Sequence, residues 1–121
     1  MSDQQRQQSD DRLMRRFARR GDRRAIDALI DRYLPSAVAV ARQILVDHAQ
    51  AEDAAQEAFL RIIRSRRRYR SDHPFSSWFY TILRNVCTDM LRRTHRHADA
   101  MRQVARSTPT HLEHRGSDET Q

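Results

Sequence analysis

The most concentrated chemistry in the sequence is a run of arginines between residues 61 and 70. Six of these ten residues are arginine, and no acidic residue lies among them to pair with their charge. They are Arg61, Arg64, Arg66, Arg67, Arg68 and Arg70. Guanidinium groups bind phosphates in a forked geometry, and a cluster this dense is typical of a surface that contacts nucleic acid. The alternative interpretation is a solvated helix face or a basic localisation signal.

Carboxylates occupy the segment just before these arginines. Asp53 and Glu57 are four residues apart, so a helix would place them on one face, flanked by Gln56. Their mutual repulsion costs a helix about 0.3 kcal/mol, which their position near the positive N-terminal end offsets. The simplest interpretation is a solvated face. The alternative is a docking face for a basic protein surface, with Leu60 as an apolar contact.

Aromatic residues follow the arginine run. They are Tyr69, Phe75, Trp78, Phe79 and Tyr80. Basic side chains hold the backbone of a single strand and aromatic rings stack on its bases, so this interleaving favours single-stranded nucleic acid as a partner. We expect Phe79 to lie in the core, whereas Trp78 fits a core position and a stacking surface equally well. Asn85 is either a base-reading side chain or merely exposed. A second basic strip comprises Arg84, Arg92, Arg93 and Arg96.

Residues suited to catalysis or to metal binding are sparse. His95 and His97 are two apart and would splay on a helix, whereas His111 and His114 lie in a polar tail without further ligands. Cys87 is the single cysteine, so we expect it to pack as a small apolar group. Asp53 and Glu57 lack a neighbouring nucleophile. We therefore expect no enzymatic activity, no cofactor and no metal.

Composition points to one small helical domain. The chain has 121 residues and a formal net charge of +7, with 38% hydrophobic and 32% charged residues, so its core must be thin. Two glycines and three prolines leave few turn signals, which disfavours a β-rich fold. No signal-peptide pattern and no run of about 18 apolar residues is visible, so we expect a cytoplasmic protein without membrane insertion.

Hydrophobic periodicity predicts an all-α bundle of about four helices. They cover about 10–20, 23–45, 47–67 and 78–96. Gly21 is expected to end the first, Asp22 and Asp47 to cap the second and third, and Ser76 or Ser77 to cap the fourth. Pro35 should kink or divide the second helix. We expect residues 1–9 to be disordered, 10–97 to form the domain, and 98–121 to be a disordered tail or linker.

Three strings resemble region 2 of the sigma-70 family of bacterial transcription initiation factors, and within it the extracytoplasmic-function group. They are ARRGDRRAIDALIDRYLP, AEDAAQEAFLRIIR and PFSSWFYTILRNVCTDMLRR. The resemblance covers about Asp10 to Arg96. It implies that the chain binds core RNA polymerase through the clamp helices of the largest subunit. The residues that match this contact are Asp53, Gln56, Glu57, Leu60 and Arg61.

The resemblance also implies that the chain recognises and melts the promoter minus-ten element. The loop 69–75 would capture a flipped base, and the fourth helix would contact the melted non-template strand. The expected DNA-binding residues are Arg67, Arg68, Tyr69, Arg70, Ser71, Asp72, His73, Phe75, Ser76, Trp78, Tyr80, Arg84, Asn85, Asp89, Arg92 and Arg93. Capturing an unstacked base costs a few kcal/mol, which pocket contacts repay.

Three departures from the family pattern qualify this expectation. Thr81 and Ile82 stand where primary sigma factors carry a pair of tryptophans, and Pro74 stiffens the loop. Nothing after Arg96 resembles region 4, which reads the minus-35 element, so the chain is a fragment, or a partner supplies that module, or the factor works without it. The alternative function is a sigma-like regulator or split sigma subunit that binds polymerase or an anti-sigma protein.

Overall fold

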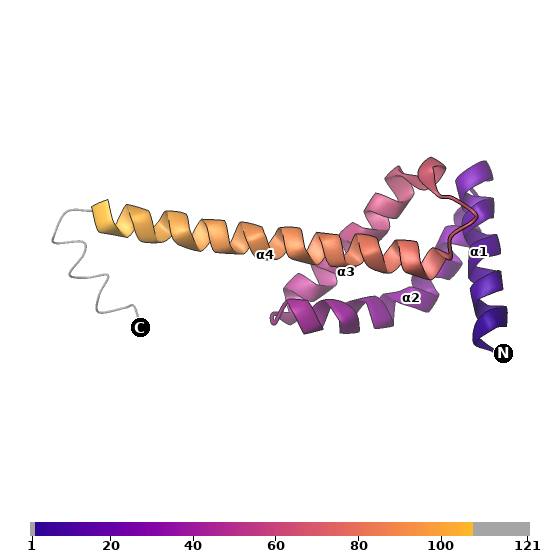
Figure 1. Cartoon of the computed structure of the whole chain (residues 1–121), viewed down its shortest axis with the longest axis horizontal. Coiled ribbons are helices and arrows are strands. Elements are labelled where there is room, and N and C mark those ends of the chain that lie inside the picture. Colours follow the sequence, from indigo (N-terminus) through magenta and orange to yellow (C-terminus); the bar gives the residue numbers. More distant parts are fainter. Residues whose placement is uncertain (1, 108–121) are drawn as a thin grey trace. The chain divides into compact units, whose positions relative to one another are not determined.

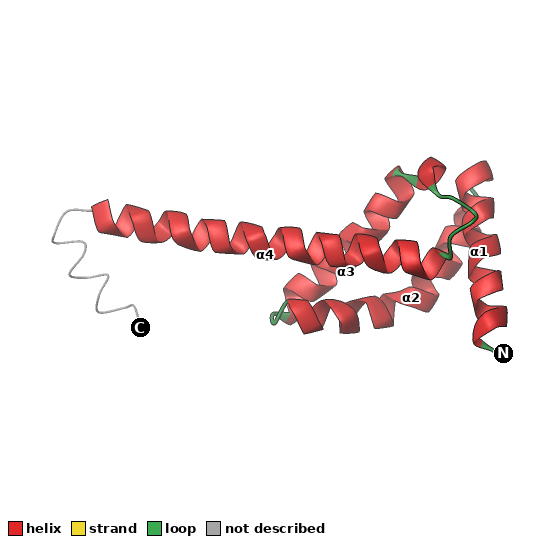
Figure 2. Cartoon of the chain, in the orientation of Figure 1, coloured by secondary structure: helices red, strands yellow, loops and turns green. Residues whose placement is uncertain are grey.

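The computed structural model describes residues 2–107, and every regular element within them is helical (Figures 1 and 2). The elements are α1 (Asp3–Arg20), α2 (Arg23–Ile44), α3 (His48–Arg64), the 3₁₀ helix η1 (Arg66–Arg68) and α4 (Phe75–Ser107). This confirms the predicted all-α fold. The chain divides into two compact units, Met1–Thr88 and Asp89–Gln121. The expected tail from residue 108 onward, with His111 and His114, lies outside the described residues.

Capping residues determine where α1 ends and where α2 and α3 begin. Gly21 follows α1 with a φ of 66°, a left-handed conformation that favours glycine. The Asp22 carboxylate accepts the Arg24 backbone N–H at 3.1 Å, and the Asp47 carboxylate accepts those of Ala49 and Gln50 at 2.8 and 3.4 Å. These contacts satisfy amides that have no partner within a helix, so both predicted N-caps are confirmed.

The core of the first unit forms where α2 packs against α1 and α3. The inward face of α3 is largely alanine (Ala51, Ala54, Ala55 and Ala58, all fully buried), which allows the helices to approach closely. Phe59 on α3 stacks on Phe79 at a centroid distance of 4.8 Å, and Tyr33 on α2 meets Phe75 edge-on at 5.1 Å. These rings fix the first turns of α4 against both helices.

A buried carboxylate joins α1 to α2. Asp10 is only 2% exposed, yet it accepts hydrogen bonds from Arg32 Nη1 at 2.5 Å and from the Tyr33 hydroxyl at 2.6 Å. Burial raises the pKa of Tyr33, and the hydrogen bond to Asp10 raises it further. A buried charge is tolerated only when it is paired and hydrogen-bonded, so this cluster fixes how α1 lies on α2.

Several boundaries differ from those predicted. Residues 3–9, expected to be disordered, are helical, because Ser2 and Gln5 form a capping box that starts α1 before Asp10. Pro35 lies within α2 and does not divide it. The third helix ends at Arg64 and gives way to η1, and α4 continues to Ser107, beyond the predicted Arg96. On the helices themselves, Ile63 is 38% exposed although it is apolar, whereas Leu83 is fully buried in the core.

The second unit, from Asp89, is described as far as Ser107 and contains the C-terminal part of α4. Asp89 pairs with Arg92 at 3.8 Å, and Asp99 pairs with Arg102. The side chains of Met101 and Val104 are exposed. Among residues 2–107, no helix is long and apolar enough to cross a membrane.

Candidate functional site

The outward side of α3 carries the predicted protein-contact residues. Asp53, Gln56, Glu57, Leu60 and Arg61 follow each other at steps of three and one, so they share one face, which we call the docking face. Asp53 and Gln56 are exposed, and Leu60 is 46% exposed. The buried alanines occupy the other side of the helix, so packing turns these five residues outward.

Glu57 links the docking face to the arginine run. It accepts from Arg61 Nε at 3.3 Å and from Arg64 Nη1 at 3.5 Å, one and two turns farther along α3. Both arginines therefore lie over the C-terminal end of the helix, where positive charge is favoured. The opposite charges of the segment are thus arranged in sequence along one helix, acidic first and basic last.

Arg66 has a role that sequence reasoning missed. Its Nη1 donates to the carbonyl oxygens of Phe17 and Ala18 at 2.8 and 2.9 Å, and its guanidinium lies 5.6 Å from the centre of the Phe17 ring. It also passes close to Gly21, where an added Cβ would lie 3.5 Å from the guanidinium. Arg66 therefore caps the C-terminus of α1, satisfying carbonyls that helix ends leave unpaired.

Arg67 and Arg68 are exposed, and each lines a different pocket; that of Arg67 is described below. Because they are consecutive in a 3₁₀ helix, their side chains point about 120° apart. Arg68 lines the Trp78 pocket, which has a volume of about 380 Å³ and is formed by Arg61, Arg64, Ser65, Arg68, Trp78 and Ile82. An indole wall beside three guanidinium groups suits a base together with its phosphate.

The loop after η1 is held by its own contacts. The Tyr69 hydroxyl donates to the His73 carbonyl oxygen at 3.1 Å, and the Tyr69 ring lies 5.4 Å from that of Trp78. Burial raises the pKa of Tyr69 to about 12, and the nearby Asp11 carboxylate adds to this rise. Ser71, Asp72 and His73 are exposed at the tip. Tyr69 is therefore neutral, and its contacts with His73 and Trp78 support the loop.

A side chain of α1 fixes the end of the loop, where α4 begins. The Phe75 backbone N–H donates to Asp11 Oδ1 at 2.7 Å, which caps the first amide of α4. This corrects the expectation that Ser76 or Ser77 caps the helix: α4 begins at Phe75, three residues before the predicted start at residue 78. Phe75 is fully buried among Tyr33, Phe79 and Trp78, so it supports the loop and does not offer its ring to a base.

The predicted DNA-binding residues of α4 differ in exposure. Arg84 and Asn85 are exposed, whereas Ser76 and Trp78 are partly buried. The Tyr80 hydroxyl lies 2.7 Å from Ser36 Oγ, which holds the ring against α2. In the second unit, Arg92 and Arg93 are exposed and Asp89 is partly buried. Cys87 is fully buried, and burial raises its thiol pKa, as expected for a packing role.

Comparisons with known proteins agree with this geometry. Residues 29–97 match the family described as Sigma-70 region 2. The chain is 34% identical over 85 residues to RNA polymerase sigma-H factor of Pseudomonas aeruginosa, covering 70% of this chain and 44% of that protein. It is 38% identical over 80 residues to the ECF RNA polymerase sigma factor SigM of Mycobacterium tuberculosis, covering 66% and 41%.

A solved structure is also similar. It is an NMR structure of an engineered region 2 of sigmaE in complex with GTAAAA, with a TM-score of 0.68 and 27% identity, covering 80% of this chain and 97% of that one. The chain spans less than half the length of the curated relatives named above. The similarity therefore concerns one region of those longer proteins.

Proposed function

Because the chain belongs to the sigma-70 region 2 family, of the extracytoplasmic-function type, we propose that it acts as a domain of a transcription initiation factor. In this role the docking face binds the clamp helices of core RNA polymerase. Its exposed Asp53, exposed Leu60 and half-buried Glu57 combine negative charge with an apolar contact, which suits a basic protein surface. Such a role places the protein in the cytoplasm, where the polymerase works.

The second part of the proposal is recognition of the melted promoter minus-ten element. The observation that carries it is the Trp78 pocket, where three arginines surround a half-buried indole beside the loop 69–74. The non-template strand would run over this pocket and over exposed Arg84 and Asn85, with Arg92 and Arg93 as further contacts. Support comes from the similar engineered region 2, which was solved with GTAAAA.

This function is binding and involves no chemical step. Stacking against an aromatic ring contributes about 1–3 kcal/mol per base, which is comparable to the cost of unstacking it. Phosphate contacts from the arginines then add affinity that falls with salt. Melting is thus favoured because the open strand gains contacts that the duplex does not offer.

A regulator that only occupies polymerase is the competing proposal, and an anti-sigma protein that covers the docking face is a further candidate partner. Two exposed arginines in η1 and the Trp78 pocket favour the DNA-binding function, because a contact with protein alone would not need them. An anti-sigma protein bound at the docking face would displace polymerase from the chain. Adding such a protein to the polymerase retention assay described below would reveal this competition.

Selection from single-stranded oligonucleotides with a short randomised stretch tests the proposal. Strands captured by the purified chain at low salt are sequenced before and after capture. We expect enrichment of a position-specific motif. A chain that captures strands without enriching any motif would have non-specific affinity only, and the minus-ten assignment would be wrong.

A further inference from the structure

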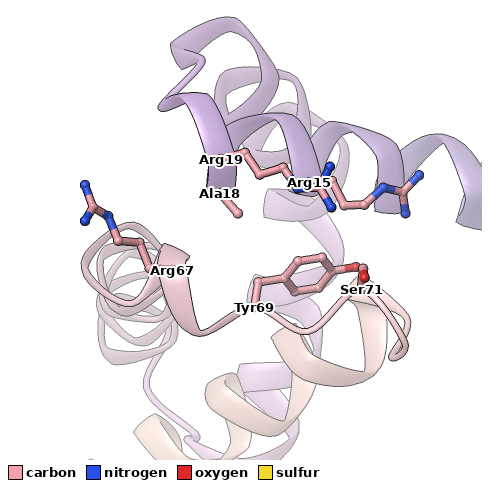
Figure 3. A pocket seen from close by; sticks show the side chains of 6 residues that line it. All are labelled: Arg15, Ala18, Arg19, Arg67, Tyr69 and Ser71. Carbon is pink, nitrogen blue, oxygen red and sulfur yellow. The ribbon is translucent and has the colours of Figure 1, made fainter.

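A second arginine-lined pocket lies between α1 and the loop (Figure 3). We call it the α1 pocket; it has a volume of about 380 Å³ and is lined by Arg15, Ala18, Arg19, Arg67, Tyr69 and Ser71. Figure 3 shows Arg19 above the Tyr69 ring, the guanidinium groups of Arg15 and Arg67 pointing to opposite sides of the view, and Ser71 beside the Tyr69 hydroxyl. Neither Arg15 nor Arg19 is among the residues expected to contact DNA.

The charges of this pocket are not balanced by ion pairs. Within the part of the chain that the structure describes, no carboxylate forms an ion pair with Arg15, Arg19 or Arg67. The nearest acid along α1 is Asp11, one turn before Arg15; its carboxylate accepts the Phe75 N–H and also lies close enough to Tyr69 to raise the pKa of that residue. Three arginines therefore line one concavity, with their guanidinium groups spread along it, and give it a positive potential that favours an anion.

The other lining groups are compatible with an anion. Tyr69 is neutral at physiological pH, and burial raises its pKa further, to about 12, so it adds no negative charge to the pocket. Ser71 offers a hydroxyl donor, and Ala18 is small enough to leave the space open. An apolar ligand would have to desolvate three arginines, which is unfavourable.

The pocket is also preformed. Arg66 fixes η1 to the end of α1, and Asp11 fixes the start of α4 to the same helix, so both ends of the loop are held against α1. Figure 1 shows the loop between η1 and α4 passing beside α1. A ligand entering a preformed site loses less free energy to ordering than one that must organise a mobile loop.

We propose that the α1 pocket binds a phosphodiester group of the single strand, with Arg15, Arg19 and Arg67 as its phosphate ligands. This inference rests on the proposed function and extends its nucleic-acid surface to α1. A phosphate is present in every strand whatever its sequence, so this contact adds affinity and holds the strand in position without reading bases. The specific readout stays with the loop and α4.

The test measures how the affinity of the full chain for labelled single strands depends on salt. The probes are a GTAAAA-containing strand and a shuffled strand of the same composition. Each phosphate contact contributes about 0.7 to the slope of log K against log salt for a single strand. R15Q/R19Q removes the contact with this one phosphodiester group and should therefore lower the slope by about 0.7 for both strands, whereas R15K/R19K should retain most of it.

The matched control is R24Q/R42Q, which removes the same charge from two exposed positions of α2 outside the pocket. A slope for R15Q/R19Q equal to that of this control would overturn the inference while leaving the proposed function intact. A loss confined to the GTAAAA strand would also overturn it, because it would mean base reading. Failure of the unmodified chain to bind either strand at low salt would contradict the proposed function itself. Matching thermal melting curves exclude unfolding as the cause.

Discussion

The Asp11 carboxylate lies 2.7 Å from the backbone nitrogen of Phe75, a residue 64 positions farther along the chain. This hydrogen bond joins α1 to the first residue of α4. Arg66 makes a second link of the same kind, because it caps the C-terminus of α1 from η1. The loop that we propose as the base-capturing element is thus anchored at both ends on one helix.

Replacing Asp11 with alanine should loosen the start of α4. The Phe75 amide would lose its acceptor in a partly buried position, which costs about 1–3 kcal/mol of unfolding free energy. Urea denaturation measures this loss. Asp11→Asn keeps an acceptor oxygen and should retain most of the stability; an equal loss in both variants would show that the negative charge, and not the cap, matters.

Arg66 and Arg67 are neighbours with different expected roles. Arg66→Met should lower the unfolding free energy by about 1.5–3 kcal/mol, because charged hydrogen bonds to two carbonyls are lost. Arg67→Met should leave stability nearly unchanged and weaken strand binding. Denaturation and anisotropy measured on both variants check this division. The reverse pattern would contradict the capping role of Arg66.

Reversing two charges of the docking face should abolish polymerase association. D53R/E57R places positive charges opposite the basic surface we expect on the partner, and it also removes the partner of Arg61 and Arg64 on α3. Retention of core polymerase on the immobilised chain measures the effect. The charge-matched control is D27R/D31R, an exposed pair with the same spacing on α2. Equal retention of the two variants would refute the docking assignment.

Phe59→Ala tests the core. Phe59 is 4% exposed and stacks on Phe79, so truncation would leave a cavity between α3 and α4 and should cost about 3–5 kcal/mol. Thermal and urea denaturation measure the loss. A cost below about 1 kcal/mol would mean that α4 does not depend on this ring.

Tyr69 should make stability depend on alkaline pH. Its folded pKa is about 12, above the ordinary value of 10.0, so the unfolded chain loses the proton first as pH rises. The contribution is complete below about pH 10 and is lost as pH approaches about 12. The unfolding free energy of Tyr69→Phe should therefore decrease less over this interval than that of the unmodified chain. Parallel decreases would show that Tyr69 does not titrate as described.

Features that depend on neighbouring residues could be predicted from the sequence. Gly21, Asp22 and Asp47 act within one helical turn, so their caps follow from residue type and order. Periodicity predicted the third helix, and Leu60, expected to face outward as an apolar contact, is 46% exposed. The docking-face and DNA contacts themselves stay predictions.

Features that depend on residues far apart in the chain could not be predicted from the sequence. No pattern around Ser76 indicates that Asp11 caps α4, and Arg66 looks like any other arginine of its run. Phe75 was expected at the DNA surface because aromatics are interleaved with arginines there, yet tertiary packing buries it completely. Arg15 and Arg19 were not predicted to contact DNA, because only folding brings them beside Arg67 and Tyr69.

The central claim is that one small helical domain holds polymerase and an open DNA strand together. Its most direct test is the recruitment of a labelled minus-ten single strand to immobilised core RNA polymerase, with and without the chain. We predict that the chain brings the strand to the polymerase, and that D53R/E57R abolishes this recruitment although the variant still binds the strand alone. Strand retention no greater with the chain than with polymerase alone would contradict the account.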